Sequence, residues 1–160
     1  MRSFRIVLMG LALVMTTAVP SRADVTAFLG ATTTPTNRAT TGGAVGTGLL
    51  LVGLEFEYSS TKADLTTGAP SLKMGSANGL LQSPVPIHGI QPYATVGAGI
   101  YRERVGALAT TGLAPNIGGG LKIELAGPLR LRVDYRVFRL GDKARYTPSH
   151  RLYAGLNLKF

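Results

Sequence analysis

The last eleven residues of the chain, His150 to Phe160, alternate between apolar and polar side chains without a break. In an extended strand, successive side chains point to opposite faces. One face of this strand carries Leu152, Ala154, Leu156, Leu158 and Phe160, and the other carries Arg151, Tyr153, Gly155, Asn157 and Lys159. Terminal residues of soluble domains usually fray, so such regularity is unexpected there. A barrel in lipid requires it, because its last strand must pair with its first to leave no open edge.

The final eight residues have the order Tyr-Ala-Gly-Leu-Asn-Leu-Lys-Phe. This segment resembles the C-terminal assembly signal of Gram-negative outer-membrane barrels, which ends on phenylalanine. Tyr153, Gly155, Leu158 and Phe160 match that pattern. The resemblance implies that the last strand is presented to the barrel-assembly machinery during insertion.

The N-terminus has the organisation of a secretory signal. Arg2 and Arg5 precede an apolar run over residues 6–15, and small residues occupy both positions that a signal peptidase reads in 21–23. The run is too short for a membrane-spanning helix, which needs about 20 apolar residues. We therefore expect cleavage after Ala23, which leaves residues 1–23 as signal peptide and 24–160 as a single exported domain.

Composition excludes several classes of protein. Loss of Arg2, Arg5 and Arg22 reduces the 17 basic residues to 14 against 8 acidic ones, for a mature charge of about +6. These charges do not cluster with aromatic residues, so nucleic acid is not an expected partner. The chain has no cysteine and two histidines, which predicts no disulfide, no lipid-modified cysteine and no metal or other cofactor.

Alternating patterns predict an all-β fold, because no long helical periodicity follows the signal. The expected strands cover residues 24–33, 42–51, 54–58, 71–82, 91–103, 117–125, 129–138 and 150–160. Longer polar loops are expected at 34–41, 60–70, 105–115 and 141–149, and shorter turns near 52, 84–89 and 126–128. Such alternation of connection lengths is typical of outer-membrane barrels with both termini in the periplasm. The prediction is a single eight-stranded antiparallel up-and-down transmembrane barrel that follows a cleaved signal peptide.

The whole mature chain resembles the small eight-stranded barrels akin to the transmembrane domain of outer-membrane protein A. Segments 93–101 and 117–125 carry this resemblance most clearly. Tryptophan is absent, although aromatic girdles at the membrane interfaces commonly include it. The girdle would have to come from Tyr58, Tyr93, Tyr101, Tyr135, Phe138 and Tyr153, with an inward orientation of some of them as the alternative. The resemblance implies an outer-membrane location and a structural or surface-interaction role for a monomer.

The charged faces of the strands are expected to point into the barrel, because Arg or Lys on lipid costs roughly 2–4 kcal/mol at the midplane. The candidates are Glu55, Glu57, Lys122, Glu124, Arg130, Arg132, Asp134, Arg136, Arg151 and Lys159. Eight strands enclose a space that side chains can fill. Two interpretations remain open: a plugged polar core that fixes the register, which we favour, and an ion path or gate.

Cationic residues at the expected outer loops form a second candidate set. They are Arg38, Lys62, Arg102, Arg104, Lys143 and Arg145. Lysine and arginine bind phosphate well, so these residues are candidate contacts for the lipopolysaccharide leaflet. Ordinary solvated loop charge is the alternative.

Two other functions are consistent with parts of the sequence. A soluble periplasmic barrel of lipocalin-like architecture would bind a small apolar ligand, with apolar faces inward and charges outward. A lipid A-modifying enzyme would need Ser149, His150 and a carboxylate to converge, although adjacent residues are poorly placed to do so. We favour a membrane barrel that is not an enzyme, with a side-chain-filled lumen rather than a pore for large solutes.

Overall fold

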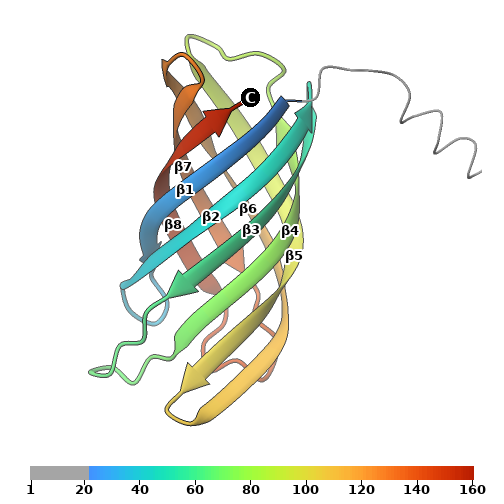
Figure 1. The fold of residues 1–160 in the computed structure, drawn as a ribbon. Coiled ribbons are helices and arrows are strands. Elements are labelled where there is room, and N and C mark those ends of the chain that lie inside the picture. The colour runs from blue at the N-terminus through green and yellow to red at the C-terminus, as the bar shows by residue number, and fades with distance from the viewer. Residues whose placement is uncertain (1–21) are drawn as a thin grey trace, which may run out of the picture.

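The computed structural model describes residues 22–160, which form one closed barrel (Figure 1). Each strand pairs with its sequence neighbours in antiparallel fashion, and β8 pairs with β1. The strands are β1 (Arg22–Thr32), β2 (Arg38–Leu49), β3 (Val52–Thr61), β4 (Ser71–Gln82), β5 (Ile90–Val105), β6 (Leu108–Ala126), β7 (Leu129–Phe138) and β8 (Ser149–Lys159). This architecture confirms the predicted fold class. The predicted signal peptide lies outside the described residues, apart from its last two positions.

The chain ends and the connections divide the barrel into two ends. Ala23 and Phe160 lie at one end, called the terminal end below, together with the turns after β2, β4 and β6. The opposite end, called the loop end, carries the segments 33–37, 62–70 and 139–148. In the described part of the chain, no helix is long and apolar enough to cross a membrane.

One predicted loop is wrong. Residues 105–115 belong to a hairpin in which Val105 pairs with Leu108, so that only Gly106 and Ala107 form the turn. The positive φ of Gly106, 58°, suits such a tight turn. β5 and β6 therefore extend past the wall at the loop end (Figure 1). The error arose because alanine, threonine and glycine resemble loop composition, whereas the ladder to β5 gives this segment its strand conformation.

The closing ladder explains why β8 alternates to its end. β8 pairs with β1 from Asp24–Lys159 to Thr32–Arg151, without a register shift. The backbone N–H of Phe160 donates to the carbonyl of Ala23 at 2.8 Å. Residues 151–159 of the last strand thus take part in removing the open edge.

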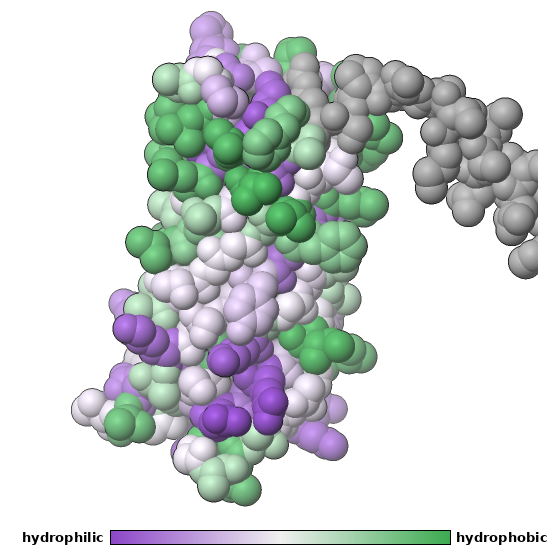
Figure 2. All heavy atoms as spheres, viewed as in Figure 1, coloured by the Kyte–Doolittle hydropathy of each residue, from purple (hydrophilic) through white to green (hydrophobic). Residues whose placement is uncertain are grey.

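Side chains alternate across the wall, with large apolar groups outside. Val96, Ile117 and Leu152 are each more than half exposed, and exposed large apolar or aromatic residues occur on every strand. Figure 2 shows many apolar side chains over the part of the barrel near the termini and hydrophilic ones toward the loop end. The ligand-binding alternative required apolar faces to point inward, and the structure has the reverse arrangement.

The outward face gives a first prediction, since Val96 is 63% exposed in the middle of β5. Replacing it with arginine should lower the free energy of unfolding in lipid vesicles by about 2–4 kcal/mol, because the charge would face hydrocarbon. Ala109→Arg, on the part of the hairpin beyond the wall, is the control and should cost less than about 1 kcal/mol. Denaturant titration of the two variants measures the difference. Equal stabilities would indicate that this face meets water.

Candidate functional site

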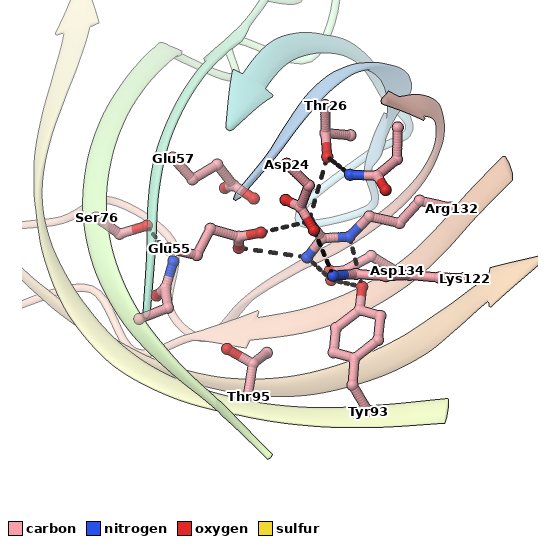
Figure 3. A network of polar contacts seen from close by, with 12 residues as sticks. Asp24, Thr26, Glu55, Glu57, Ser76, Tyr93, Thr95, Lys122, Arg132 and Asp134 are labelled. Carbon is pink, nitrogen blue, oxygen red and sulfur yellow. Dashed lines mark hydrogen bonds and ion pairs between the residues drawn. The ribbon is translucent and has the colours of Figure 1, made fainter. Parts of the chain in front are cut away.

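The centre of the barrel holds a network of buried charges (Figure 3). Alternation along β7 turns Arg132, Asp134 and Arg136 inward, where each is fully buried. Both guanidinium groups bind Glu55 of β3: Arg132 through both terminal nitrogens and Arg136 through Nη2 at 2.7 Å. Asp134 accepts from Arg136 Nε at 2.9 Å and from Arg132 Nη2 at 3.2 Å. Each buried charge therefore has opposite charges beside it, as burial requires.

Tyr93 of β5 completes this network. Its hydroxyl donates to Asp134 and accepts from Arg132 Nε at 2.7 Å. The Arg132 guanidinium also lies over the Tyr93 ring, 4.8 Å from the centroid. Strands on opposite walls are thereby joined through a single arginine side chain.

A second group of charges lies nearer the terminal end. Asp24 accepts from Lys122 Nζ at 2.8 Å and from Arg130 Nη2 at 3.1 Å. Arg130 also donates to Asn157 at 2.8 Å and to Gln91 at 3.1 Å. A cavity of about 70 Å³ opens beside these groups. Sequence reasoning missed Asp24 as an interior charge because this residue starts the expected mature chain. The next residue, Val25, is apolar and belongs to the outward face, so alternation would have indicated an inward side chain for Asp24.

Toward the loop end, ion pairs give way to hydroxyl and apolar groups. Arg151 binds Glu57 and donates to Ser59 at 2.8 Å, and its guanidinium lies 4.7 Å from the Phe138 ring centroid. Threonine hydroxyls from β1, β2 and β3 form a hydrogen-bonded triangle. A buried apolar cluster lies next to this triangle and is made of Leu72, Met74, Tyr101, Ala114, Phe138 and Leu140. Hydroxyl and apolar groups thus lie side by side toward the loop end, with Thr61 directly opposite Leu72 in the sheet.

The structure places most of the predicted interior charges inside the barrel. The buried ones are Glu55, Glu57, Lys122, Arg130, Arg132, Asp134, Arg136 and Arg151. Lys159 is half-buried and lines the cavity at the terminal end. The prediction for Glu124 is wrong, because this side chain is exposed. The pairing of β6 with β7 shifts register between Glu124 and Ala126, next to the turn, and the side chain lies at the rim.

Two residues of the assembly-signal pattern face the interior. Tyr153 is buried and stacks on Phe28 with ring centroids 4.0 Å apart. Gly155 also lies beside Phe28. A Cβ added at Gly155 would come within 2.5 Å of the Ala27 carbonyl oxygen and 2.7 Å of the Phe28 Cβ. Leu158 and Phe160 are exposed on the outside. The pattern therefore has a packing role in the folded barrel, and its role in assembly stays a prediction.

The aromatic residues expected to form a girdle are mostly internal. Tyr93, Tyr101, Phe138 and Tyr153 are buried, whereas Tyr58 and Tyr135 are exposed. The alternation of each strand decides this, because each internal aromatic shares its face with polar or charged neighbours at two-residue spacing.

The cations predicted at the outer loops all lie toward the loop end, but one is not available to lipid. Arg38 is buried, and its guanidinium donates to the carbonyls of Pro70 and Thr34, so the prediction for it is wrong. It begins β2 on the inward face instead of lying in the expected loop. The exposed members are Lys62, Arg102, Arg104, Lys143 and Arg145. Sequence reasoning missed Lys73, which is exposed on the outward face of β4 directly opposite Arg102.

The 62–70 segment is organised by Asp64. Its carboxylate accepts from the Thr67 hydroxyl and the Thr66 backbone N–H, each at 2.9 Å. The hydrogen bond from Thr67 contributes most to holding the pKa of Asp64 below its usual value. This carboxylate is engaged within its own turn, and within residues 22–160 it forms no ion pair with the exposed cations of the loop end.

The residues considered for catalysis do not converge. Ser149 is buried on the inner face of β8, whereas His150 points outward and its Nδ1 lies 2.7 Å from the Tyr135 hydroxyl. Adjacent strand residues face opposite sides, so this Ser-His pair cannot share one substrate. Among residues 22–160, no group of histidine and carboxylate side chains is arranged to hold a metal ion.

No protein-family model matches the sequence, and a search of curated proteins finds no match. Among solved structures, the N-terminal barrel domain of OprF from Pseudomonas aeruginosa is similar, with a TM-score of 0.71, 17% identity, and coverage of 87% of this chain and 97% of that one. Neisserial surface protein A gives a TM-score of 0.64 and 15% identity, with 88% and 96% covered. The outer membrane enzyme PagL gives 0.52 and 18%, with 86% and 98% covered.

The chain has the fold of the small eight-stranded outer-membrane barrels. This confirms the resemblance to barrels akin to outer-membrane protein A at the level of the fold. The similarity and the apolar exterior together support a membrane-spanning barrel. One of the similar structures is an enzyme, so the fold alone does not decide whether the chain catalyses a reaction.

Proposed function

We propose that this chain is an integral outer-membrane barrel with a structural or surface-interaction role, whose lumen does not pass large solutes. The observation that carries the proposal is the contrast between its two faces: fully buried, mutually paired charges inside and exposed apolar side chains outside. A water-soluble barrel gains nothing from this arrangement, whereas lipid favours it.

Three levels of side chains support a filled lumen. The pairs around Asp24, the network around Glu55 and the apolar cluster around Tyr101 follow one another along the axis. A solute of sugar size would have to break buried ion pairs and then displace the apolar cluster. Opening such pairs is expensive, because each separated charge would be left without its partner.

A permeability assay tests the closed lumen. Vesicles that contain the folded protein should swell in an isosmotic pentose solution no faster than protein-free vesicles. Vesicles with a general sixteen-stranded porin serve as the positive control, since such barrels leave an aqueous channel. Swelling at a rate that scales with the amount of this protein would contradict the proposal.

The remaining parts of the proposal concern cellular context. Export with cleavage near Ala23 and insertion by the barrel-assembly machinery are consistent with the N-terminal and C-terminal patterns. We propose that the folded barrel resides in the outer membrane as a monomer. The exposed cations at the loop end suit the phosphates of lipopolysaccharide. We propose no enzymatic activity, because Ser149 and His150 lie on opposite faces of the wall.

A further inference from the structure

The outer wall has an apolar hollow over β2 to β5. Two adjacent rungs of the sheet form it: Gly43, Tyr58, Gly75 and Ile100 in one, and Val45, Phe56, Ala77 and Ala98 in the other. Along β4, Gly75 and Ala77 form the floor, with Tyr58 and Phe56 on one side and Ile100 on the other. The hollow has a volume of about 600 Å³ and opens outward.

The floor of the hollow is not required by packing of the barrel. A Cβ added at Gly75 would meet no atom within 4 Å, unlike one at Gly99 or Gly155, where backbone atoms lie within 2.5 Å. Glycine within a strand weakens it and often marks a close approach by another molecule. The space above Gly75 is therefore open for a ligand rather than for a neighbouring strand.

Cations lie immediately beyond the hollow, on the side of the loop end. The next rung of the sheet pairs Lys73 of β4 with Arg102 of β5, and the one after it places Arg104 opposite Ser71. All three cations are exposed, and no ion pair joins them to an acid among the described residues. On β5, every outward side chain from Ile90 to Ile100 is uncharged, so Arg102 is the first charge met from the terminal end.

We propose that this face is a docking site for one lipopolysaccharide molecule, with a lipid A phosphate on Lys73 and Arg102 and an acyl chain in the hollow over Gly75 and Ala77. The inference rests on the proposed outer-membrane location. Charge complementarity identifies the phosphate end, because unpaired cations at a membrane boundary form short, charge-assisted hydrogen bonds with phosphate oxygens. A distance of two residues along β4 brings the head group and the start of the chain to about 7 Å of each other.

A second hollow provides a control within the same molecule. It has about 670 Å³ and lies over β1, β2, β7 and β8, lined by Ala27, Leu29, Leu131, Ala154 and Leu156 among others. The next outward positions toward the loop end are Ala31, Ala39, Val133 and Leu152, none of which is charged. Filling this hollow should therefore leave the proposed binding unchanged.

The test measures binding of deep-rough lipopolysaccharide with two lipid A phosphates to the folded protein in zwitterionic nanodiscs. Gly75→Leu fills the hollow, and Lys73→Gln with Arg102→Gln removes the phosphate contacts. We expect the loss of the two cations to weaken apparent affinity by about tenfold or more, the scale of a lost charge-assisted contact. Gly75→Leu should weaken it by about tenfold as well, because it excludes apolar groups of the acyl chain from the hollow. Ala27→Leu should stay within about twofold of the original protein, and Lys73→Arg with Arg102 intact should bind as well as the original.

The outcomes separate this inference from the proposed function. If Gly75→Leu binds as tightly as the original protein, the hollow takes no part and the site is wrong. If phosphatidylglycerol binds with equal affinity, the partner is an anionic phospholipid and the assignment to lipopolysaccharide is wrong. Each variant is also checked for heat-dependent mobility, so a protein that folds in lipid without binding lipopolysaccharide refutes only the inference. A protein that does not fold in lipid refutes the proposed function.

Discussion

Replacement of Glu55 by alanine should lower the free energy of unfolding by about 3–5 kcal/mol, the cost of leaving buried charges without a partner. The Glu55 carboxylate is 1% exposed and binds the guanidinium groups of both Arg132 and Arg136. Its loss leaves two arginines with only Asp134 and Glu57 for compensation. Urea titration of the barrel refolded in vesicles, followed by circular dichroism, measures the effect.

Glu124→Ala is the matched control, because it removes the same chemical group from the exposed rim. Surface changes of this kind usually alter stability by no more than about 0.5 kcal/mol. If both variants lose the same amount, the Glu55 network is not a source of stability. Combining Glu55→Ala with Arg132→Ala should cost less than the sum of the single changes, since the two side chains contact each other.

Deletion of Phe160 should have a different effect in cells and in a purified system. In cells, the amount of folded barrel in the outer membrane should fall to a small fraction, because the C-terminal pattern loses its last residue. In purified form, the truncated chain should refold in vesicles nearly as well as the full chain. Phe160 is 68% exposed, and the one backbone hydrogen bond of its N–H goes to Ala23, which the expected cleavage removes. Immunoblots of membrane fractions and refolding yields measure the two effects.

Two further variants serve as controls for the deletion of Phe160. Phe160→Tyr keeps the terminal aromatic ring and should assemble, and Leu156→Ala removes an exposed apolar side chain elsewhere on β8 and should assemble as well. An equal loss of folded barrel in cells and of refolding yield in vesicles would mean that Phe160 acts through the stability of the barrel. Normal levels of the truncated protein in cells would exclude the assembly role.

The alternation of the sequence predicted most of the interior because a strand offers only two faces. The face of β7 that carries Arg130, Arg132, Asp134 and Arg136 is continuous in sequence, and lipid excludes it from the outside. Which charges pair with which was not predictable. Arg132 and Glu55 are 77 positions apart, and their contact depends on the curvature and register of a closed wall.

The errors have local causes. Glu124 keeps the parity of an inward residue but lies where the register shifts beside a turn. Residues 105–115 look like a loop in composition, and their strand conformation comes from hydrogen bonds to β5. Lys73 was missed because β4 is rich in small residues, which weakened its pattern and left the outward face unassigned. In each case, the conformation or the orientation of the side chain depends on pairing with a neighbouring strand, which the local sequence does not reveal.

The central claim is that a closed barrel resides in the outer membrane. Gel mobility of the outer-membrane fraction in dodecyl sulfate, with and without boiling, tests it most directly. The account predicts that the protein pellets with outer membranes and migrates at two positions, because a closed hydrogen-bonded wall resists detergent until it is heated. A protein found in the soluble periplasmic fraction, with a single mobility in both lanes, would contradict the account.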